Sequence, residues 1–328
     1  MNETSNLPQR PSAAQKMATM RAMLKSGKII VSPGCYDGYS ARLIEKKGFK
    51  ACAVSGAGLS NSRFSQPDVG IMGLLENVDG CKHLAQSVSI PMMADADNGY
   101  GNAVTVYHAV QYFEEAGIVG INIEDQVIPK RCGHMRGKEV IDPRDAAAKI
   151  EAAVRARRDS NFIINARTDA IAVEGLEGAI KRAKLYLAAG ADMVYPDAIA
   201  SADDIRRFVD AVQAPVNVNM GFGVRSRPTT PLISPLELEK MGVARVSCAR
   251  MLPAAAIKAM DIALGLWADC SATGTIHDRP DLLAGIEDVT ELMGYEFIDA
   301  LERSVLSEEE LQRRYRDAER SFVIRSPH

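Results

Sequence analysis

The sequence lacks an excess of charge of either sign. Its 328 residues include 39 Lys and Arg against 42 Asp and Glu, which gives a formal net charge of −3. Binding to nucleic acid or to an anionic membrane usually needs a strong positive charge, so this balance supports neither partner. With 25% charged and 47% hydrophobic residues, the composition is that of a globular protein and not of a disordered chain.

Paired cysteines and long apolar segments are also missing. The six cysteines are scattered without a C-x-x-C pair, so neither a disulfide framework nor a zinc ribbon is indicated. The polar segment 1–15 has no apolar core of a secretory signal, and the most apolar stretch, 253–267, is interrupted by Lys258 and Asp261. We therefore expect a soluble, cytoplasmic protein with reduced thiols.

Short β-branched runs alternate with helical segments between residues 28 and 267. Eight runs are candidate strands: 28–32, 51–55, 91–95, 119–124, 162–167, 192–195, 215–219 and 244–247. Helical segments lie between them, and several end on a glycine, which is a common helix stop. Because parallel strands need helical crossovers, the pattern predicts an α/β fold, a (β/α)8 TIM barrel. A doubly wound open sheet is the alternative.

The sequence predicts three segments. Residues 1–15 are expected to form a mobile arm, 16–267 the barrel, and 268–328 a helical extension with helices at 282–293 and 307–319. Helices beyond a complete barrel must bury their apolar faces on the barrel or on another subunit. We therefore expect the extension to be used in oligomerisation.

Polar side chains follow the ends of six successive predicted strands. Residues two apart in a strand point the same way, and active sites of such barrels lie at the carboxyl ends of the strands. The residues that share the inward parity are Ala53 and Ser55, Asp95 and Asp97, Asn122 and Glu124, Asn165, Arg167 and Asp169, Tyr195 and Asp197, and Asn217 and Asn219. Five carboxylates and an arginine at one barrel mouth indicate a functional site.

Two further features suggest chemistry. Asp95, Asp97 and Glu124 are hard oxygen ligands on adjacent strands, which suits Mg²⁺, with Mn²⁺ as a substitute. The loop 125–144 is much longer than the two to six residues usual between a strand and a helix, which is typical of a lid. Within it, Cys132 lies near Lys130, Arg131, His134 and Arg136, a cationic setting that favours the reactive thiolate.

Five motifs together resemble the isocitrate lyase/phosphoenolpyruvate mutase superfamily, most closely its 2-methylisocitrate lyase-like and alkylmalate lyase-like members. They are Ser55-Gly56-Ala57, Asp95-Ala96-Asp97-Asn98-Gly99-Tyr100-Gly101, Ile123-Glu124-Asp125-Gln126, Lys130-Arg131-Cys132-Gly133-His134 and Ala166-Arg167-Thr168-Asp169. The resemblance implies a barrel whose eighth helix is exchanged between subunits in a homotetramer, a dimer of dimers, with Mg²⁺ at the strand ends.

The resemblance also implies roles for single residues. Asp95, Asp97, Glu124 and Asp68 would hold the metal directly or through water, while Ser55 and the amides of Gly56 and Ala57 would hold the 2-oxo-acid half of the substrate. Arg167 would clamp a carboxylate, and Asn219 and Thr230 would bind the distal one. Cys132 would donate a proton with support from His134, and Asp197 would stand at a catalytic position that usually carries Glu.

The resemblance implies a Mg²⁺-dependent carbon–carbon lyase that cleaves a 2-hydroxy di- or tricarboxylate to a 2-oxo acid such as pyruvate plus a carboxylate such as succinate. The general base stays open among metal-bound water, Tyr100 and a carboxylate. The alternatives are oxaloacetate decarboxylation, phosphonopyruvate hydrolysis or mutation, and a barrel kept as a scaffold.

Several residues depart from the family pattern. Ala53 replaces an aromatic residue, Asn122 replaces a common His, and the segment 220–227 carries Arg225 and Arg227. We expect from these changes a pocket that takes a substrate bulkier or more polar than 2-methylisocitrate.

Overall fold

The computed structural model describes residues 9–131, 135, 137–225 and 229–315. By its internal contacts the chain divides into two units, Pro11–Thr275 and a second unit made of Met1–Arg10 with Ile276–His328.

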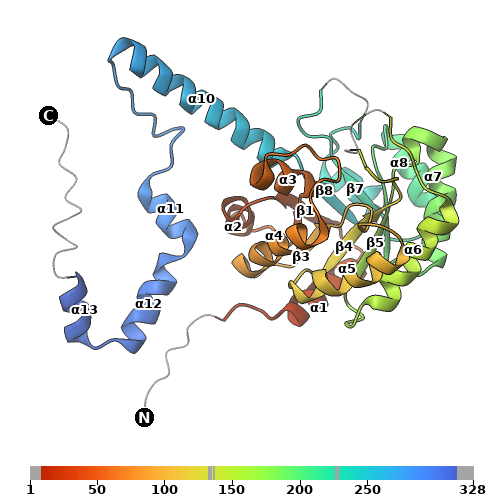
Figure 1. The fold of residues 1–328 in the computed structure, drawn as a ribbon, viewed down its shortest axis with the longest axis horizontal. Helices are drawn as coiled ribbons and strands as arrows, with labels where there is room; N and C mark the ends of the chain where they lie inside the picture. The colour runs from red at the N-terminus through yellow and green to blue at the C-terminus, as the bar shows by residue number, and fades with distance from the viewer. Residues whose placement is uncertain (1–8, 132–134, 136, 226–228, 316–328) are drawn as a thin grey trace. The chain divides into compact units, whose positions relative to one another are not determined.

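Eight parallel strands form a barrel in the first unit. They are β1 (Ile30–Cys35), β2 (Cys52–Val54), β3 (Met92–Asp95), β4 (Gly120–Glu124), β5 (Ile163–Thr168), β6 (Met193–Pro196), β7 (Asn217–Asn219) and β8 (Arg245–Cys248). Their order is β6-β5-β4-β3-β2-β1-β8-β7, and a parallel bridge between Val194 and Val216 joins the two end strands. The predicted (β/α)8 fold is confirmed, and each strand falls within three residues of its expected position (Figure 1).

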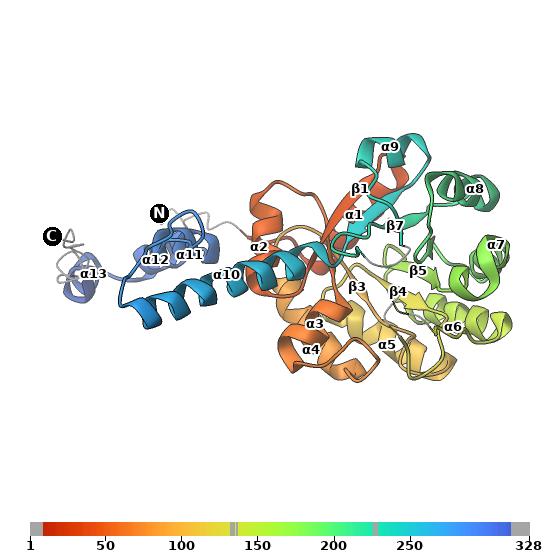
Figure 2. The same ribbon diagram turned by 90° about the horizontal axis from the view of Figure 1, so that it is seen from above.

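Helices surround the strands, as Figure 2 shows. They are α2 (Gly38–Lys46), α3 (Gly56–Phe64), α4 (Leu74–Ser87), α5 (Ala103–Glu115), α6 (Pro143–Ala156), α7 (Ile171–Ala188), α8 (Ala202–Val212) and α9 (Pro235–Lys240). The sequence analysis did not predict α3 or α4. α3 opens with glycines and α4 contains one, and glycine weakens the intrinsic preference for a helix.

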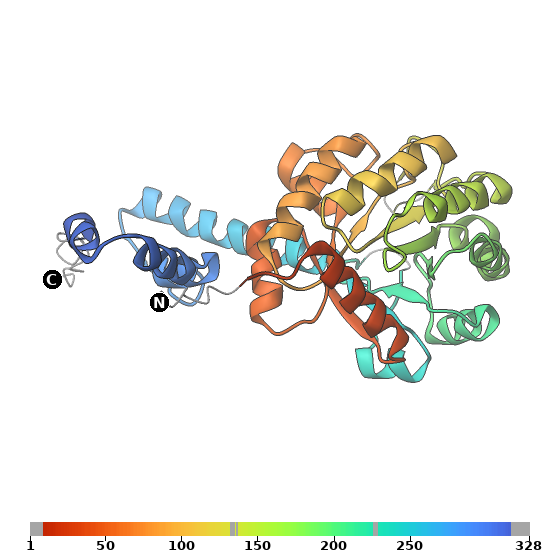
Figure 3. The same ribbon diagram turned by 90° about the horizontal axis from the view of Figure 1, so that it is seen from below.

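The first helix, α1 (Ala13–Lys25), begins inside the segment expected to be a mobile arm. Ser12 and Gln15 form a capping box there, a signal that the sequence analysis overlooked. The buried Lys16 donates to the carbonyl oxygens of Ala85 and Val88, and Arg21 pairs with Asp192 at 2.8 Å. These partners precede β3 and β6, so α1 lies over the amino end of the barrel, away from the carboxyl ends of the strands (Figure 3).

The predicted alternation of side chains along the strands holds in the structure. Ile121 and Ile123 of β4 join the buried apolar cluster, whereas Asn122, between them, accepts a hydrogen bond of 2.8 Å from the side chain of Asn165 on β5. Polar groups therefore share the barrel interior, and apolar groups pack against the helices.

A long helix, α10 (Met251–Thr273), follows the last strand, and none of its 23 residues is buried. Its most apolar 18-residue window has a mean hydropathy of 1.4, so by length and composition α10 could cross a membrane, the one such helix among the described residues. Lys258 and Asp261 place charge near its middle, with 3.5 Å between Lys258 Nζ and Asp261 Oδ2. Charge at the centre of a helix opposes insertion into lipid.

The second unit contains three short helices, α11 (Ile286–Met293), α12 (Tyr295–Val305) and α13 (Glu308–Tyr315). The sequence analysis expected the first and the last of them, with α13 capped by Ser307, whose hydroxyl accepts from the Glu310 amide at 3.3 Å. α12 was not predicted. No residue of the three helices is buried.

Candidate active site

A cavity of about 60 Å³ opens at the carboxyl ends of the barrel strands. Seven of the residues predicted for the site line it, namely Ser55, Ala57, Asp68, Asp95, Arg167, Asp197 and Asn219. Ala53, Asn122 and Tyr195 line it as their parity predicts. Residues from β8 and the turn after it, Arg245, Ser247, Ala249 and Arg250, complete the wall, and the sequence analysis gave them no role.

The amino end of α3 forms one side of this cavity. Ser55 caps the helix, because its Oγ accepts a hydrogen bond of 3.0 Å from the Gly58 amide. Gly56 follows, and a Cβ atom at that position would come within 3.0 Å of Asp95 Oδ2. The missing side chain therefore lets the helix approach Asp95. The first amides of a helix have no partner within it, so the amides of Gly56 and Ala57 can bind an anion.

Four carboxylates surround a buried lysine on the opposite side. Lys130 Nζ lies 2.6 Å from Asp68 Oδ1 and 2.5 Å from Asp97 Oδ1. Burial opposes its charge, but Asp97, Glu124, Asp68 and Asp95 outweigh that effect and hold the pKa of Lys130 well above its usual value. Lys130 therefore stays protonated and neutralises part of the acidic cluster.

The other two carboxylates keep atoms without partners. Asp95 Oδ1 and Glu124 Oε1 are buried and accept no hydrogen bond. Burial raises the pKa of Asp95 to about 6 and that of Glu124 well above its ordinary value, while Lys130 and Arg167 act in the opposite direction. A carboxylate that lacks a partner in a buried site is costly unless a cation or a proton neutralises it.

These unpaired oxygens fit a hydrated divalent cation. Among the described residues no three carboxylate, thiol or imidazole groups lie close enough to enclose a metal by themselves. Mg²⁺ needs no such cage, because it usually keeps several waters and takes one or two carboxylates from the protein. Asp95 and Glu124 are the residues that could hold it, while Lys130 engages Asp68 and Asp97.

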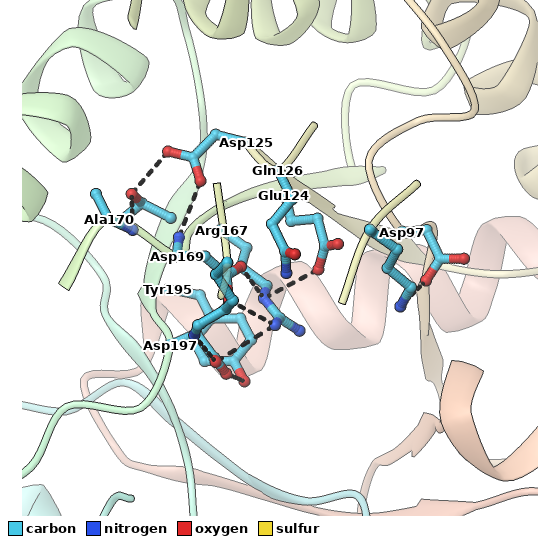
Figure 4. Close-up of polar contacts among 12 residues, drawn as sticks. Asp97, Glu124, Asp125, Gln126, Arg167, Asp169, Ala170, Tyr195 and Asp197 are labelled. Carbon is cyan, nitrogen blue, oxygen red and sulfur yellow. Dashed lines mark hydrogen bonds and ion pairs between the residues drawn. The ribbon is translucent and has the colours of Figure 1, made fainter. Parts of the chain in front are cut away.

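Arg167 occupies the centre of a second charged cluster, shown in Figure 4. Its Nε lies 2.9 Å from Asp169 Oδ2 and 3.3 Å from Glu124 Oε2, and its Nη2 lies 3.4 Å from Asp197 Oδ2. Lys138, which the sequence analysis left without a role, joins Asp169 at 2.9 Å and Asp197 at 3.3 Å. The guanidinium is therefore fixed in place before any ligand binds.

Asp197 also receives a hydrogen bond of 2.7 Å from the hydroxyl of Tyr195. The Arg167 guanidinium lies over the ring of that tyrosine, with 5.2 Å between Cζ and the ring centre. Asp197 stands where the family usually has Glu, and its carboxylate contacts both Tyr195 of the same strand and Arg167.

Asp125 supports this cluster from behind. It accepts hydrogen bonds from the Thr168 hydroxyl at 2.7 Å and the Asp169 amide at 2.9 Å (Figure 4), and one from the Tyr186 hydroxyl at 2.7 Å. Arg182 lies 3.4 Å from the same carboxylate. Asp125 thus fixes the turn after β5 that carries Asp169.

The predicted carboxylate-binding residues lie in different surroundings. Asn219 Oδ1 accepts from Ser247 Oγ at 3.1 Å and from the Ala249 amide at 3.3 Å, which leaves its amide nitrogen as the group that can donate to a ligand. Thr230 is buried, accepts from the Gly221 amide through its carbonyl oxygen at 3.3 Å and does not line the cavity. Arg225 is exposed and does not line it either, while Arg227 lies outside the described residues.

The structure describes one candidate base, Tyr100, but not the predicted proton donor. Cys132 and His134 lie outside the described residues. Lys130, one of the cationic residues expected near Cys132, forms ion pairs with Asp68 and Asp97. Tyr100 does not line the cavity, accepts from Asn77 Nδ2 at 2.6 Å, and has a pKa that burial and Asp97 raise well above 10. Tyr100 is therefore poorly suited to act as a base.

The comparisons with known proteins agree with this fold. The family described as phosphoenolpyruvate phosphomutase matches residues 20–265. The chain therefore belongs to this family, within the phosphoenolpyruvate mutase/isocitrate lyase superfamily, as its motifs indicated.

Two curated relatives are carbon–carbon lyases. A 2,3-dimethylmalate lyase from Eubacterium barkeri is 35% identical over 287 residues, which cover 88% of this chain and 97% of the relative. A 2-methylisocitrate lyase from Aeropyrum pernix is 39% identical over 277 residues, covering 84% and 86%. The prediction of an enzyme resembling these lyases is confirmed.

A solved structure of a phosphonopyruvate hydrolase in complex with oxalate and Mg²⁺ superposes with a TM-score of 0.78. It is 29% identical, and the alignment covers 89% of this chain and 99% of that one. The same fold thus supports both carbon–carbon and carbon–phosphorus cleavage. The fold therefore does not identify the substrate, which depends on the residues of the cavity.

Proposed function

We propose that the protein is a Mg²⁺-dependent lyase that cleaves the C2–C3 bond of a 2-hydroxy di- or tricarboxylate of the 2-methylisocitrate or 2-alkylmalate type. The products are a 2-oxo acid such as pyruvate and a carboxylate such as succinate. The observation that carries the proposal is one cavity that brings together the amino end of α3, unpaired carboxylate oxygens near β3 and β4, and the fixed guanidinium of Arg167.

Each side of the cavity suits one part of such a substrate. The amides of Gly56 and Ala57, at the amino end of α3, and the Ser55 hydroxyl would hold the carboxylate of the 2-oxo-acid half. A Mg²⁺ ion held by Asp95 and Glu124 would polarise the C2 hydroxyl and the adjacent carboxylate. Arg167 and the amide of Asn219 would orient the carboxylate of the leaving half.

The reaction requires two proton movements. A base removes the C2 hydroxyl proton, the C2–C3 bonding electrons move to C3 and its carboxylate, and C2 becomes a carbonyl. The Cys132 thiol, supported by His134, then protonates C3 to release the saturated carboxylate.

The purified chain should be assayed with Mg²⁺ on 2-methylisocitrate, isocitrate, 2,3-dimethylmalate, oxaloacetate and phosphonopyruvate. We expect a 2-hydroxy acid to yield equal amounts of 2-oxo acid and saturated carboxylate. Release of carbon dioxide from oxaloacetate, or of phosphate from phosphonopyruvate, with no cleavage of any hydroxy acid would overturn the proposal. The likeness to phosphonopyruvate hydrolase makes phosphonopyruvate the main rival substrate.

We further propose that the segments outside the barrel assemble a homotetramer, in which α10 packs on a neighbouring subunit. The support is the exposure of its apolar residues, with Leu264 at 69% and Trp267 at 67%, since monomers rarely expose large contiguous apolar surfaces. Light scattering should give four times the 35.5 kDa chain mass, and Leu264→Asp should lower it. A monodisperse wild-type monomer would contradict the proposal.

A further inference from the structure

Arg245 on β8 is a fully buried cation with neutral partners. Its side chain donates from Nε to Ser32 Oγ at 3.2 Å and from Nη1 to Asn217 Oδ1 at 2.9 Å. Its Nη2 is buried and has no hydrogen-bond partner. No ion pair joins Arg245 to a carboxylate among the described residues.

The other two arginines that the structure shows as buried, Arg167 and Arg182, differ from Arg245 because each pairs with carboxylates. Arg167 pairs with Asp169, Glu124 and Asp197, and Arg182 pairs with Asp125 and Glu174. An unpaired buried charge costs several kcal/mol, roughly the penalty that ion pairing normally offsets. Burial lowers the pKa of Arg245 to about 10, so the side chain still carries its charge at neutral pH. This charge therefore needs an anion that the described chain does not supply.

Arg245 lines the same cavity as Ser55, Asp95 and Arg167. Ala53 on β2 lines it too, at the position where the related lyases and mutases usually carry an aromatic side chain. Alanine takes less room than such a ring, so it leaves more of the cavity open at this position. Arg225 does not line the cavity, so among the described residues the positive charge on this side comes from Arg245 on β8 and from Arg250 just after it.

We propose that Arg245 is a substrate-binding residue that takes a carboxylate of the substrate at the β8 side of the cavity, in the space left by Ala53. Ser32 and Asn217 position the guanidinium, and Nη2 is the donor left for the ligand. This inference rests on the proposed lyase function and narrows its substrate. The preferred substrate is a 2-hydroxy tricarboxylate, or one with an additional anionic group, and not a simple alkylmalate.

Binding of unreactive acids tests this assignment. Isothermal titration with Mg²⁺ present should compare oxalate, which reaches only the α3 and metal side, with propane-1,2,3-tricarboxylate, which can span the cavity. A hydrogen bond to a charged group contributes about 1.5–3 kcal/mol. We therefore expect Arg245→Gln to weaken the tricarboxylate about 10- to 100-fold and to leave oxalate unchanged within about threefold, the ordinary scatter of such effects.

Two further variants keep the test decisive if Arg245→Gln fails to fold. Ala53→Tyr leaves the arginine intact but fills the space in front of it, and it should weaken the tricarboxylate and not oxalate. Arg245→Lys should restore part of the affinity. Equal weakening of oxalate and the tricarboxylate in these variants, or no weakening of the tricarboxylate, would overturn the assignment.

The two proposals fail in different ways. If the wild-type protein binds the tricarboxylate through Arg245 but cleaves none of the 2-hydroxy acids, the reaction is wrong and the anion site stands. If it cleaves alkylmalates efficiently and does not bind the tricarboxylate, the reaction stands and the role of Arg245 is wrong.

Discussion

The two halves of the cavity wall are built in opposite ways. From β3 to β6, acidic and basic side chains are paired repeatedly: Lys130 joins two aspartates, and Arg167 and Lys138 share Asp169 and Asp197. From β7 to β2, the wall consists mostly of neutral groups such as Asn219, Ser247, Ala53 and Ser55, with Arg245 as an unpaired charge.

The difference separates two tasks. Paired charges hold each other in fixed positions before substrate arrives, which is what stabilisation of developing charge requires. Neutral side chains form no ion pairs that a ligand would have to break, so they can adjust to different ligands at a lower free-energy cost than the paired charges. We therefore expect substitutions in the charged half to affect the rate or the fold, and those in the neutral half to affect the choice of substrate.

The largest expected effect is the loss of Asp95. Asp95→Ala removes an unpaired carboxylate and should abolish turnover, and chelation of the wild-type protein should do the same until Mg²⁺ or Mn²⁺ is restored. The measurement is 2-oxo-acid release. Asp79→Ala, which removes an exposed carboxylate paired with Arg63, is the control and should keep full activity. Full activity of Asp95→Ala without added metal would contradict metal dependence.

Asp125→Asn should mainly destabilise the charged half. The substitution removes the charge opposite Arg182 and one of the acceptors used by Thr168, Asp169 and Tyr186. We expect the free energy of unfolding to fall by about 3 kcal/mol, the lower end for breaking a buried pair. Urea unfolding measures it, and Glu177→Gln, in an exposed pair with Arg207, should cost less than about 0.5 kcal/mol. Equal effects of the two would refute the supporting role.

Cys132→Ser distinguishes a lyase from a decarboxylase or hydrolase. If the thiol protonates the carbanion, kcat should fall at least about 10²-fold while KM changes little, because general acids contribute 10²–10⁴-fold. Cys270→Ser, on α10, is the matched control. Near-normal turnover of Cys132→Ser would favour the decarboxylase or hydrolase.

The smallest effect is expected in the neutral half. Ala53→Tyr should raise kcat/KM for 2,3-dimethylmalate, a dicarboxylate, relative to 2-methylisocitrate, a tricarboxylate, by about tenfold, the low end for changing one pocket contact. The ratio of the two constants is the measurement. If Ala53→Tyr leaves this ratio unchanged, the space beside Ala53 is not used for substrate choice.

The sequence predicted the barrel because strand and helix periodicity are local properties. Residues 119–124 indicate a strand by themselves, and parity alone places Asn122 and Glu124 on the inward side. The motif Ser55-Gly56-Ala57 likewise predicted a site at the end of its strand, although the helix that Ser55 caps was not predicted. These features can be predicted from neighbouring residues alone, without the residues on the opposite side of the barrel.

Pairing of charges was decided by the tertiary structure alone. The ion-pair partners of Lys130, Asp68 and Asp97, lie 62 and 33 positions earlier in the chain, and no local pattern around Lys130 indicated them. Arg245 looks like an ordinary strand residue until the barrel closes and leaves it among Ser32 and Asn217 without a carboxylate. Which charged groups surround a residue depends on contacts between segments that are distant in the chain, and local sequence patterns do not encode these contacts.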